Sequence, residues 1–347
     1  MNSLPETLQR YFLAFILTIV LFIILTYVIS MGLGVLVLFS TAEGLEFSRG
    51  SKTIYPLLFV AVEVNVNAGL YFLLLWWIFA LCFAAAWRFR ESLLIQIGGF
   101  LSKTRGNPFS NNLLAMPLIT SMLFVATIVL HFLQSQSGVP TGEPYFGDPL
   151  SAFLQFSRAA VVEEIIFRII PIGAFLVTYI SIVGKSTRPH FSSVQRFKTC
   201  ILAVLLPEKA KERVGLRTIG EGGLFSGGLT VAEWTMVVFT ASLFGIAHYG
   251  GWEIGKILPA ALSGVVFAIA YLYYGIQAPI LLHWFFNYYF TVFGLSLDFY
   301  SAEIDTMYSL TFLANIFLGV ILWLAVAIFG LIALFGKFKK KTIPPEP

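Results

Sequence analysis

The sequence predicts an all-α polytopic integral membrane protein, a bundle of about eight transmembrane helices. Hydrophobic residues make up 58% of the 347 positions, and charged residues only 12%, about half the share in an average soluble domain. Runs of about 20 apolar residues follow one another along the chain, and such runs cross a bilayer as helices. Cys82 and Cys200 are too few and too far apart for a disulfide framework or a thiolate metal cluster.

The order of apolar and polar runs gives the expected spans. They are residues 11–39, 68–87, 113–133, 150–183, 232–248, 256–274, 279–297 and 310–335. The first run is too long for a signal-peptide core and lacks a small-residue cleavage site, so it is expected to be retained. Pro171 is expected to kink the fourth span. Within 59–67, valines alternate with Glu and Asn, which predicts a short extended segment. It is either a strand edge for a peptide substrate or, the favoured interpretation, a polar flank of the next span.

The distribution of positive charge predicts that both termini are cytosolic. Of the 22 Lys and Arg residues, 17 lie on the side of the termini and only Arg49, Lys52 and Lys256 on the other. The chain is therefore expected in a membrane as a multi-pass protein, and in the cell membrane if its source is prokaryotic. Its basic residues are not interleaved with aromatic residues in polar segments, so the expected partner is the lipid bilayer and not nucleic acid.

Three regions follow from this pattern. Residues 1–150 form an N-terminal membrane region with three spans, 151–297 a core with a basic cytosolic insertion at about 185–231, and 298–347 the final span with a basic tail. Within the insertion, apolar residues recur at helical spacing from Val194 to Leu205 beside basic residues. This predicts a helix that lies on the membrane surface or an ordinary packed loop helix, and the pattern leaves both open.

The stretch Glu163-Glu164-Ile165-Ile166-Phe167-Arg168 places three charges inside the fourth span. A charge near a bilayer centre costs at least a few kcal/mol, so such residues usually pair or mark function. Glu164 and Arg168 are four residues apart, share a helix face and are expected to pair. Glu163 points about 100° away and is left without that partner, which suits a general base. The alternative is that all three form a structural ion-pair network.

Two later spans carry histidines with polar or aromatic companions. Phe244 and His248 are one turn apart on the fifth span, and His283 and Asn287 share one face of the seventh. A lone histidine in an apolar helix is more often structural than catalytic, and His131 and His190 receive that interpretation. His248 and His283 differ because they follow the glutamate pair in order.

The expected spans raise a geometric conflict. They place Glu163 near mid-membrane, His248 near the outer end of its helix and His283 near the inner end of its own. These side chains meet only if helices are tilted or broken. Glycines and prolines near the motifs offer places for breaks, namely Pro171, Gly245, Gly250, Gly251, Pro259 and Pro279.

The ordered set EExxxR, FxxxH and HxxxN resembles the CAAX protease and bacteriocin-processing family, which includes the type II CAAX prenyl endopeptidases. The resemblance covers roughly residues 151–297, and the chain departs from the family in its long basic insertion. It implies an intramembrane endopeptidase that hydrolyses a peptide bond of a membrane-associated protein, prenylated or not.

The resemblance also implies roles for individual residues. Glu163 and His248 would hold and activate a water, while His283 and Asn287 would bind the oxyanion that forms when the water attacks. Glu164 with Arg168 would fix the helix and tune Glu163. The assignment of the base to Glu163 and not Glu164 rests on pairing geometry alone.

Several alternatives remain open at this point. Glu163, His248 and His283 offer a carboxylate and two imidazoles that zinc could accept. Because no HExxH helix is present, the expectation is a mechanism without metal or cofactor. A transporter or proton pathway would also use intramembrane Glu, Arg and His, although no internal repeat is evident. A non-catalytic immunity or scaffold protein is the third class.

Overall fold

The chain forms a helical bundle, described here from a computed structural model that covers residues 6–54, 64–88, 92–101, 108–142, 147–187, 191–224 and 228–341. The elements of the first half are α1 (Glu6–Ser40), α2 (Ala42–Arg49), β1 (Ser51–Ile54), β2 (Val64–Asn67), α3 (Ala68–Arg88), α4 (Leu93–Leu101), η1 (Pro108–Ser110), α5 (Asn112–Gln136), α6 (Pro149–Glu164), η2 (Ile165–Ile169) and α7 (Ile170–Thr187). Those of the second half are α8 (Ser193–Leu205), α9 (Pro207–Val214), α10 (Ile219–Gly222), α11 (Val231–Ala247), η4 (His248–Gly250), η5 (Ile254–Lys256), α12 (Ile257–Tyr274), α13 (Gln277–Trp284), η6 (Phe285–Tyr289), α14 (Phe290–Leu297) and α15 (Ser301–Lys341).

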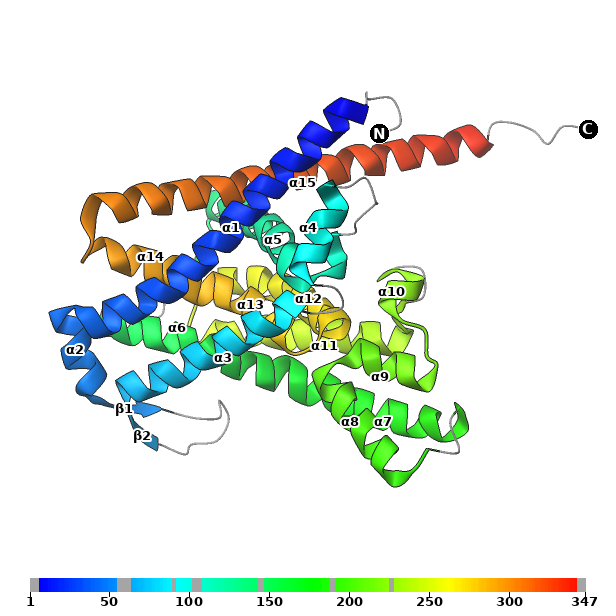
Figure 1. The fold of residues 1–347 in the computed structure, drawn as a ribbon, viewed down its shortest axis with the longest axis horizontal. Helices are drawn as coiled ribbons and strands as arrows, with labels where there is room; N and C mark the ends of the chain where they lie inside the picture. The colour runs from blue at the N-terminus through cyan, green and yellow to red at the C-terminus, as the bar shows by residue number, and fades with distance from the viewer. Residues whose placement is uncertain are drawn as a thin grey trace, which may run out of the picture.

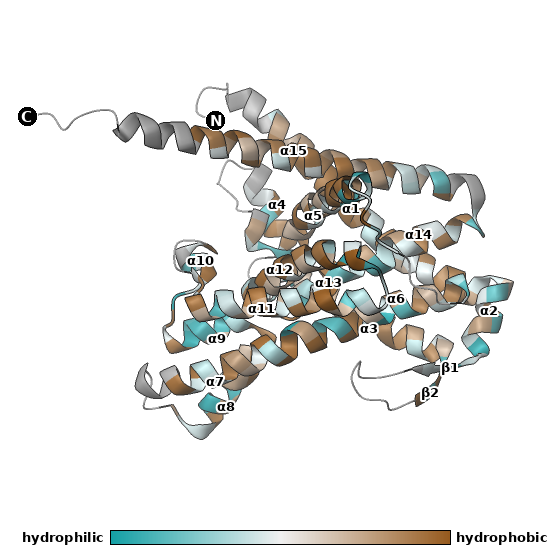
Figure 2. Ribbon diagram, turned by 180° about the vertical axis from the view of Figure 1, so that it is seen from behind, coloured by the Kyte–Doolittle hydropathy of each residue, from teal (hydrophilic) through white to brown (hydrophobic). Residues whose placement is uncertain are grey.

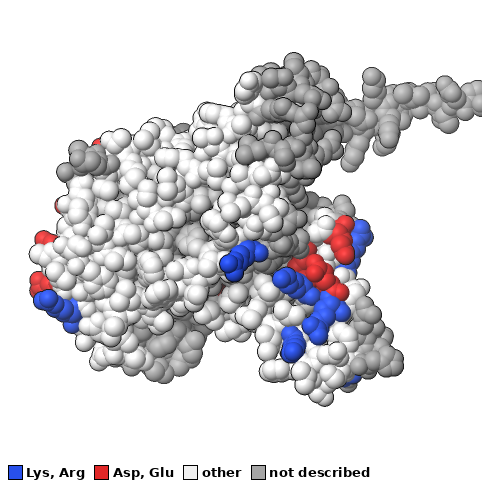
Figure 3. Space-filling model, viewed as in Figure 1, with Lys and Arg blue, Asp and Glu red and all other residues white. Residues whose placement is uncertain are grey.

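Eight runs of helix in the described residues are long and apolar enough to cross a membrane. They are α1, α3, α5, α6 with α7, α11, α12, α13 with α14, and α15. In Figure 1 these runs lie side by side, and the start of α1 and the end of α15 are on the same side of the molecule. Apolar residues dominate the long helices, whereas hydrophilic residues gather on α2 and α9 (Figure 2). In one view, charged side chains lie mainly at the two ends of a largely uncharged body (Figure 3). The predicted all-α polytopic bundle is confirmed.

A small antiparallel hairpin follows α2. It pairs β1 with β2 in a register that sets Ser51 opposite Asn67 and Ile54 opposite Val64. The predicted extended conformation is confirmed for 64–67, and residues 59–63 lie outside the described residues. The strand at 51–54 was not predicted, because its short polar sequence becomes a strand only through its partner. Parts of the basic connector (89–91 and 102–107) and of the insertion (188–190 and 225–227) also lie outside the described residues.

The centre of the bundle is α13, all of whose residues are buried. Aromatic rings surround its last residue, Trp284. The ring centroid of Trp284 lies 5.0 Å from that of Phe83, 5.4 Å from Tyr288 and 5.6 Å from Tyr27. Membrane helices associate through such close packing, since lipid tails are as apolar as the side chains themselves. This layer fixes the helix that carries His283.

Helices α11 and α12 approach each other closely through glycine. A Cβ atom at Gly245 would lie 2.7 Å from the Ile257 carbonyl oxygen, and one at Gly264 would lie 2.9 Å from the Cα of Ala241. Side chains at these positions would push the helices apart, so the contact is built on small residues. The same contact brings the end of α11, where His248 lies, against the start of α12.

The basic insertion packs on the end of α7. Ser192 and Gln195 form a capping box that starts α8, and Thr199 and Ala203 face inward. The opposite face is exposed, with Val194, Phe197, Ile201 and Leu205. The helix predicted at 194–205 is confirmed, and it both packs against α7 and presents an apolar stripe.

A buried ion pair ties this insertion to the fifth span. The Lys211 Nζ on α9 lies 2.8 Å and 3.1 Å from the two Glu233 carboxylate oxygens and donates to the Gly228 carbonyl oxygen at 3.0 Å. Glu233 also accepts from the Thr230 N–H at 2.7 Å, which closes a capping box at the start of α11. The ion pair gives each of the three N–H groups of the Lys211 ammonium an acceptor and fixes the start of α11.

Candidate active site

Two of the three motifs of the core, EExxxR and HxxxN, run into π turns. The chain passes from α6 through η2 into α7, where the Ile170 N–H donates to the Ile165 carbonyl oxygen five residues back. A second π turn, η6, joins α13 to α14 and contains Asn287. The kink predicted at Pro171 is therefore a π turn that ends just before the proline. Single π turns inside α-helices are frequent at functional sites.

Glu164, Arg168 and His283 form a buried cluster. The Arg168 Nη1 donates to Glu164 Oε1 at 3.0 Å, and both side chains are 0% exposed. The His283 Nδ1 lies 2.7 Å from the same oxygen. The Phe244 ring stacks on the guanidinium at 4.0 Å, and a Cβ atom at Gly264 would stand only 3.1 Å from Arg168 Nη2. The expected pairing of Glu164 with Arg168 is present, and it also orients His283.

Glu163 faces a different set of groups. Its Oε2 lies 3.9 Å from His248 Nε2 and 3.8 Å from His283 Nε2, and this buried oxygen has no hydrogen-bond partner in the structure. These separations exceed direct hydrogen-bond reach, and one water molecule can bridge groups at this spacing. The carboxylate therefore points to a spot that both imidazoles also face.

The hydrogen bonds made by the Nδ1 atoms of His248 and His283 indicate which ring nitrogen carries the proton. We infer that His248 Nδ1–H donates to the Phe244 carbonyl oxygen at 2.7 Å. Likewise, His283 Nδ1–H donates to Glu164 Oε1, the oxygen that also accepts from Arg168 Nη1. A neutral imidazole with a proton on Nδ1 has a lone pair on Nε2. Both Nε2 atoms then carry a lone pair on the side that Glu163 faces.

Asn287 completes the arrangement. Its Nδ2 lies 3.0 Å from His283 Nε2 and donates to the Phe156 carbonyl oxygen at 3.4 Å. The carbonyl contact identifies this end of the amide as the donor, which agrees with the lone pair inferred on His283 Nε2. The structure thus brings together all six candidate residues, Glu163, Glu164, Arg168, His248, His283 and Asn287.

A cavity of about 120 Å³ lies beside these groups. It is lined by Thr127, His131, Phe244, His248, Lys256, Pro259, Ala260, Ser263, Phe267, His283, Phe286 and Asn287. The ammonium group of Lys256 stacks over the Trp252 ring at 3.9 Å, and no described carboxylate forms an ion pair with it. Sequence reasoning placed Lys256 at the outer end of the span 256–274 and gave His131 a structural role, because neither belongs to a motif that marks the cavity.

The conflict between the depths of the expected spans is removed by breaks at the motifs. Glu164 is the last residue of α6, His248 begins the 3-10 turn after α11, and His283 precedes the second π turn. Each motif residue therefore lies next to a change of helix geometry and not within a straight helix. Such changes redirect side chains by a large part of a turn without ending the span.

The donor set does not fit zinc. The His283 Nε2 lone pair faces the Asn287 amide, which would have to be displaced before a metal could bind. Within the described parts of the chain, no group of three His, Cys, Asp or Glu side chains has the geometry of a metal site. The proposed mechanism therefore has no metal-dependent step, and the metal-free mechanism stays a prediction.

The comparisons with known proteins bear on the same segment of the chain. Residues 146–289 match the family model described as type II CAAX prenyl endopeptidase Rce1-like. Neither the curated proteins nor the solved structures gave a match. The matched segment contains all six candidate residues. Residues 146–289 are therefore similar to the type II CAAX prenyl endopeptidases of the CAAX protease family.

Proposed function

We propose that the chain is an intramembrane endopeptidase in which Glu163 activates a water for attack on a peptide bond. One observation carries this proposal: the buried Glu163 Oε2 has no hydrogen-bond partner and lies 3.8 Å and 3.9 Å from two imidazole nitrogens. A nucleophilic water needs acceptors for its two protons, and Glu163 Oε2 with His248 Nε2 supplies them, since His283 Nε2 already accepts from Asn287 Nδ2. Glu164 is unsuited to this role because its Oε1 already receives two hydrogen bonds.

The proposed reaction conserves protons at each step. The water oxygen attacks the peptide carbonyl carbon while one of its protons passes to Glu163. The C–N bond then breaks, and Glu163 returns the proton to the leaving amine. His248, held by the Phe244 carbonyl oxygen, orients the water throughout. The products are a free carboxylic acid and a free amine.

The oxyanion formed by the attack needs a donor. The Asn287 Nδ2 is the donor of the pair, since His283 Nε2 accepts in the arrangement described above. The oxyanion would take the Nδ2–H that donates to the Phe156 carbonyl oxygen at the long distance of 3.4 Å. We therefore assign oxyanion binding to Asn287 and the positioning of Asn287 to His283, whereas the family resemblance implies that both bind the oxyanion. Removing one such donor typically costs about 10²–10³ in kcat.

The cavity favours a substrate that has both an apolar segment and an anionic group. Phe244, Phe267 and Phe286 line it beside the polar groups, which suits an apolar peptide segment that reaches the site from the membrane. The Lys256 ammonium group would bind an anionic group, such as the free carboxylate at the end of a short leaving peptide. The proposed substrate is thus a membrane-associated protein cleaved near its C-terminus, and prenylation of that protein is part of the proposal to be tested.

Cleavage of a defined peptide tests the proposal. The purified protein in lipid vesicles is given a quenched fluorescent CAAX-type peptide, with and without a farnesyl group. Glu163→Gln and His248→Gln should reduce kcat by about 10²–10⁴, since general-base catalysis contributes that range. Glu212→Gln, an exposed carboxylate on α9, is the matched control and should cleave normally. Undiminished cleavage by Glu163→Gln refutes the mechanism, and solute or proton flux that needs Glu163 without any cleaved product indicates a transporter instead.

A further inference from the structure

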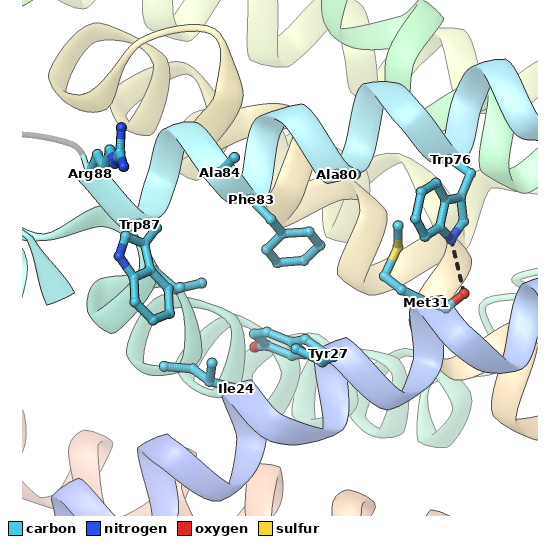
Figure 4. Close-up of a pocket in the computed structure, with 11 residues that line it drawn as sticks. Ile24, Tyr27, Met31, Trp76, Ala80, Phe83, Ala84, Trp87 and Arg88 are labelled. Atoms are coloured by element: carbon cyan, nitrogen blue, oxygen red, sulfur yellow. Dashed lines mark hydrogen bonds between the residues drawn. The ribbon is translucent and has the colours of Figure 1, made fainter. Parts of the chain in front are cut away.

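A second hollow lies away from the candidate active site. It has a volume of about 550 Å³ and lies between α1 and α3, against the start of α5 (Figure 4). Pockets of about 300–1,000 Å³ hold ligands of drug or cofactor size. Nothing in the proposed hydrolysis uses this space, which we call the α1–α3 groove.

The wall of the groove has almost no free polar group. The Trp76 indole Nε1 donates to the Met31 carbonyl oxygen at 3.0 Å, as Figure 4 shows, and the Tyr27 hydroxyl lies 3.2 Å from Thr120 Oγ1. The remaining wall consists of aliphatic and aromatic carbon, including Ile24 and Phe83. Such a surface suits a hydrocarbon chain and offers nothing to a polar solute.

One end of the groove differs from the rest. Trp87 and Arg88 lie there at the end of α3, both exposed, and no described residue forms a hydrogen bond or ion pair with the Arg88 guanidinium. Guanidinium groups bind phosphate through paired hydrogen bonds. The groove therefore combines a long apolar wall with a single cationic end.

The length and position of the groove match one leaflet of a bilayer. Trp76 and Arg88 are separated by about 18 Å along α3 at 1.5 Å per residue. The hydrocarbon of one leaflet is about 15 Å thick, half of the ~30 Å core. Arg88 begins the basic connector that the charge distribution places on the cytosolic side, where anionic lipids attract Lys and Arg.

We propose that the α1–α3 groove binds an anionic phospholipid of the cytosolic leaflet. One acyl chain lies along the wall from Trp87 to Trp76, and the phosphate meets Arg88. The floor of the groove connects this site to the catalytic helix, because Tyr27 and Phe83 pack against Trp284, the neighbour of His283. The inference does not depend on the proposed protease activity.

Photolabelling with defined lipids tests the site. The full-length protein is placed in phosphatidylcholine vesicles that contain a trace of phosphatidylglycerol with a photoreactive acyl chain, and labelled peptides are identified by mass spectrometry. Labels are expected in 24–31 and 76–88. Ala84→Phe, which fills the groove, and Arg88→Gln, which removes the charge, should each reduce labelling at least fivefold. Ala85→Phe, outside the groove on the same helix, and Arg49→Gln, at the opposite end of the molecule, are the controls and should label normally.

Three outcomes would overturn the proposal. Labelling that is unchanged by both Ala84→Phe and Arg88→Gln would mean that no lipid occupies the groove specifically. Equal labelling by the corresponding phosphatidylcholine probe would mean that the headgroup is not recognised. Displacement of the label by a farnesylated peptide would assign the groove to a lipidated substrate and not to a membrane lipid.

Discussion

The two adjacent glutamates should separate stability from activity. Replacing Glu164 by Ala leaves the Arg168 guanidinium, which is 0% exposed, without its carboxylate. Arg168 Nε and Nη2 already lack hydrogen-bond partners, and the rings of Phe244 and Phe267 lie 4.0 Å and 5.4 Å from the guanidinium. Breaking a buried pair by removing one partner costs about 3–5 kcal/mol, of which cation–π contacts offset about 1. We expect Glu164→Ala to lower the free energy of unfolding by about 3 kcal/mol.

Glu163→Gln should behave in the opposite way. Its Oε2 makes no hydrogen bond, so the isosteric amide should change the free energy of unfolding by less than ~1 kcal/mol, while cleavage is lost. A third variant, Glu164→Leu with Arg168→Met, removes both charges of the pair. It should regain at least half of the stability that Glu164→Ala loses, because a buried pair exchanged for apolar residues is often neutral.

Reversible unfolding in mixed micelles, followed by circular dichroism, measures these differences. The peptide-cleavage assay is run on the same preparations. The reasoning is wrong if Glu163→Gln unfolds as easily as Glu164→Ala, or if Glu164→Ala is as stable as the wild-type protein. It is also wrong if the double variant is less stable than Glu164→Ala, since that would show that the charges are not coupled.

Three further outcomes follow from contacts outside the pair. Lys256→Met should raise KM for short peptides with a free C-terminal carboxylate and leave kcat unchanged, and a C-terminal amide on the peptide should abolish the difference. Lys211→Met should cost about 3–5 kcal/mol of stability by leaving the buried Glu233 carboxylate without its counter-charge, whereas the exposed Lys209→Met should cost less than ~0.5. Asp148→Ala should cost about 1 kcal/mol, because the side chain caps α6 through the Ser151 N–H at 2.8 Å. Burial raises the pKa of Asp148, but the hydrogen bonds from Ser151 and the charge of Lys52 lower it by more, so the net pKa is lowered. The charged cap therefore contributes its full stabilisation at pH values above the ordinary pKa of ~3.9. Thermal unfolding at several pH values should show that the stability difference between the wild-type protein and Asp148→Ala shrinks as the pH falls through the lowered pKa.

The spans could be predicted because the bilayer imposes one dominant rule. Runs of about 20 apolar residues have no alternative to helix in a membrane, so their number and order follow from hydropathy. The pairing of Glu164 with Arg168 was also predictable, since four-residue spacing places two side chains on one helix face. The hydrogen bond between His283 and Glu164 was not, because the two residues are 119 positions apart and the sequence carries no local signal of their contact.

The limits of sequence reasoning are clearest at the cavity. His131 and Lys256 belong to different spans and to no motif, and only the packing of α5 against α12 brings them to one wall. The α1–α3 groove is likewise formed by aromatic residues that look like ordinary lipid-facing positions in the sequence. Such features depend on which faces of the helices meet, and hydropathy does not determine helix rotation about its own axis.

The two π turns have a consequence for how this core tolerates changes in length. Each turn holds one residue more than an α-helix would place there, at 165–169 and at 285–289. Deleting a single residue from either segment would let the helix return to regular geometry while its composition stayed apolar. Every side chain beyond the deletion would then turn by about 100° relative to those before it. A chain with such a deletion would still show eight apolar spans, yet its polar groups would no longer face one another.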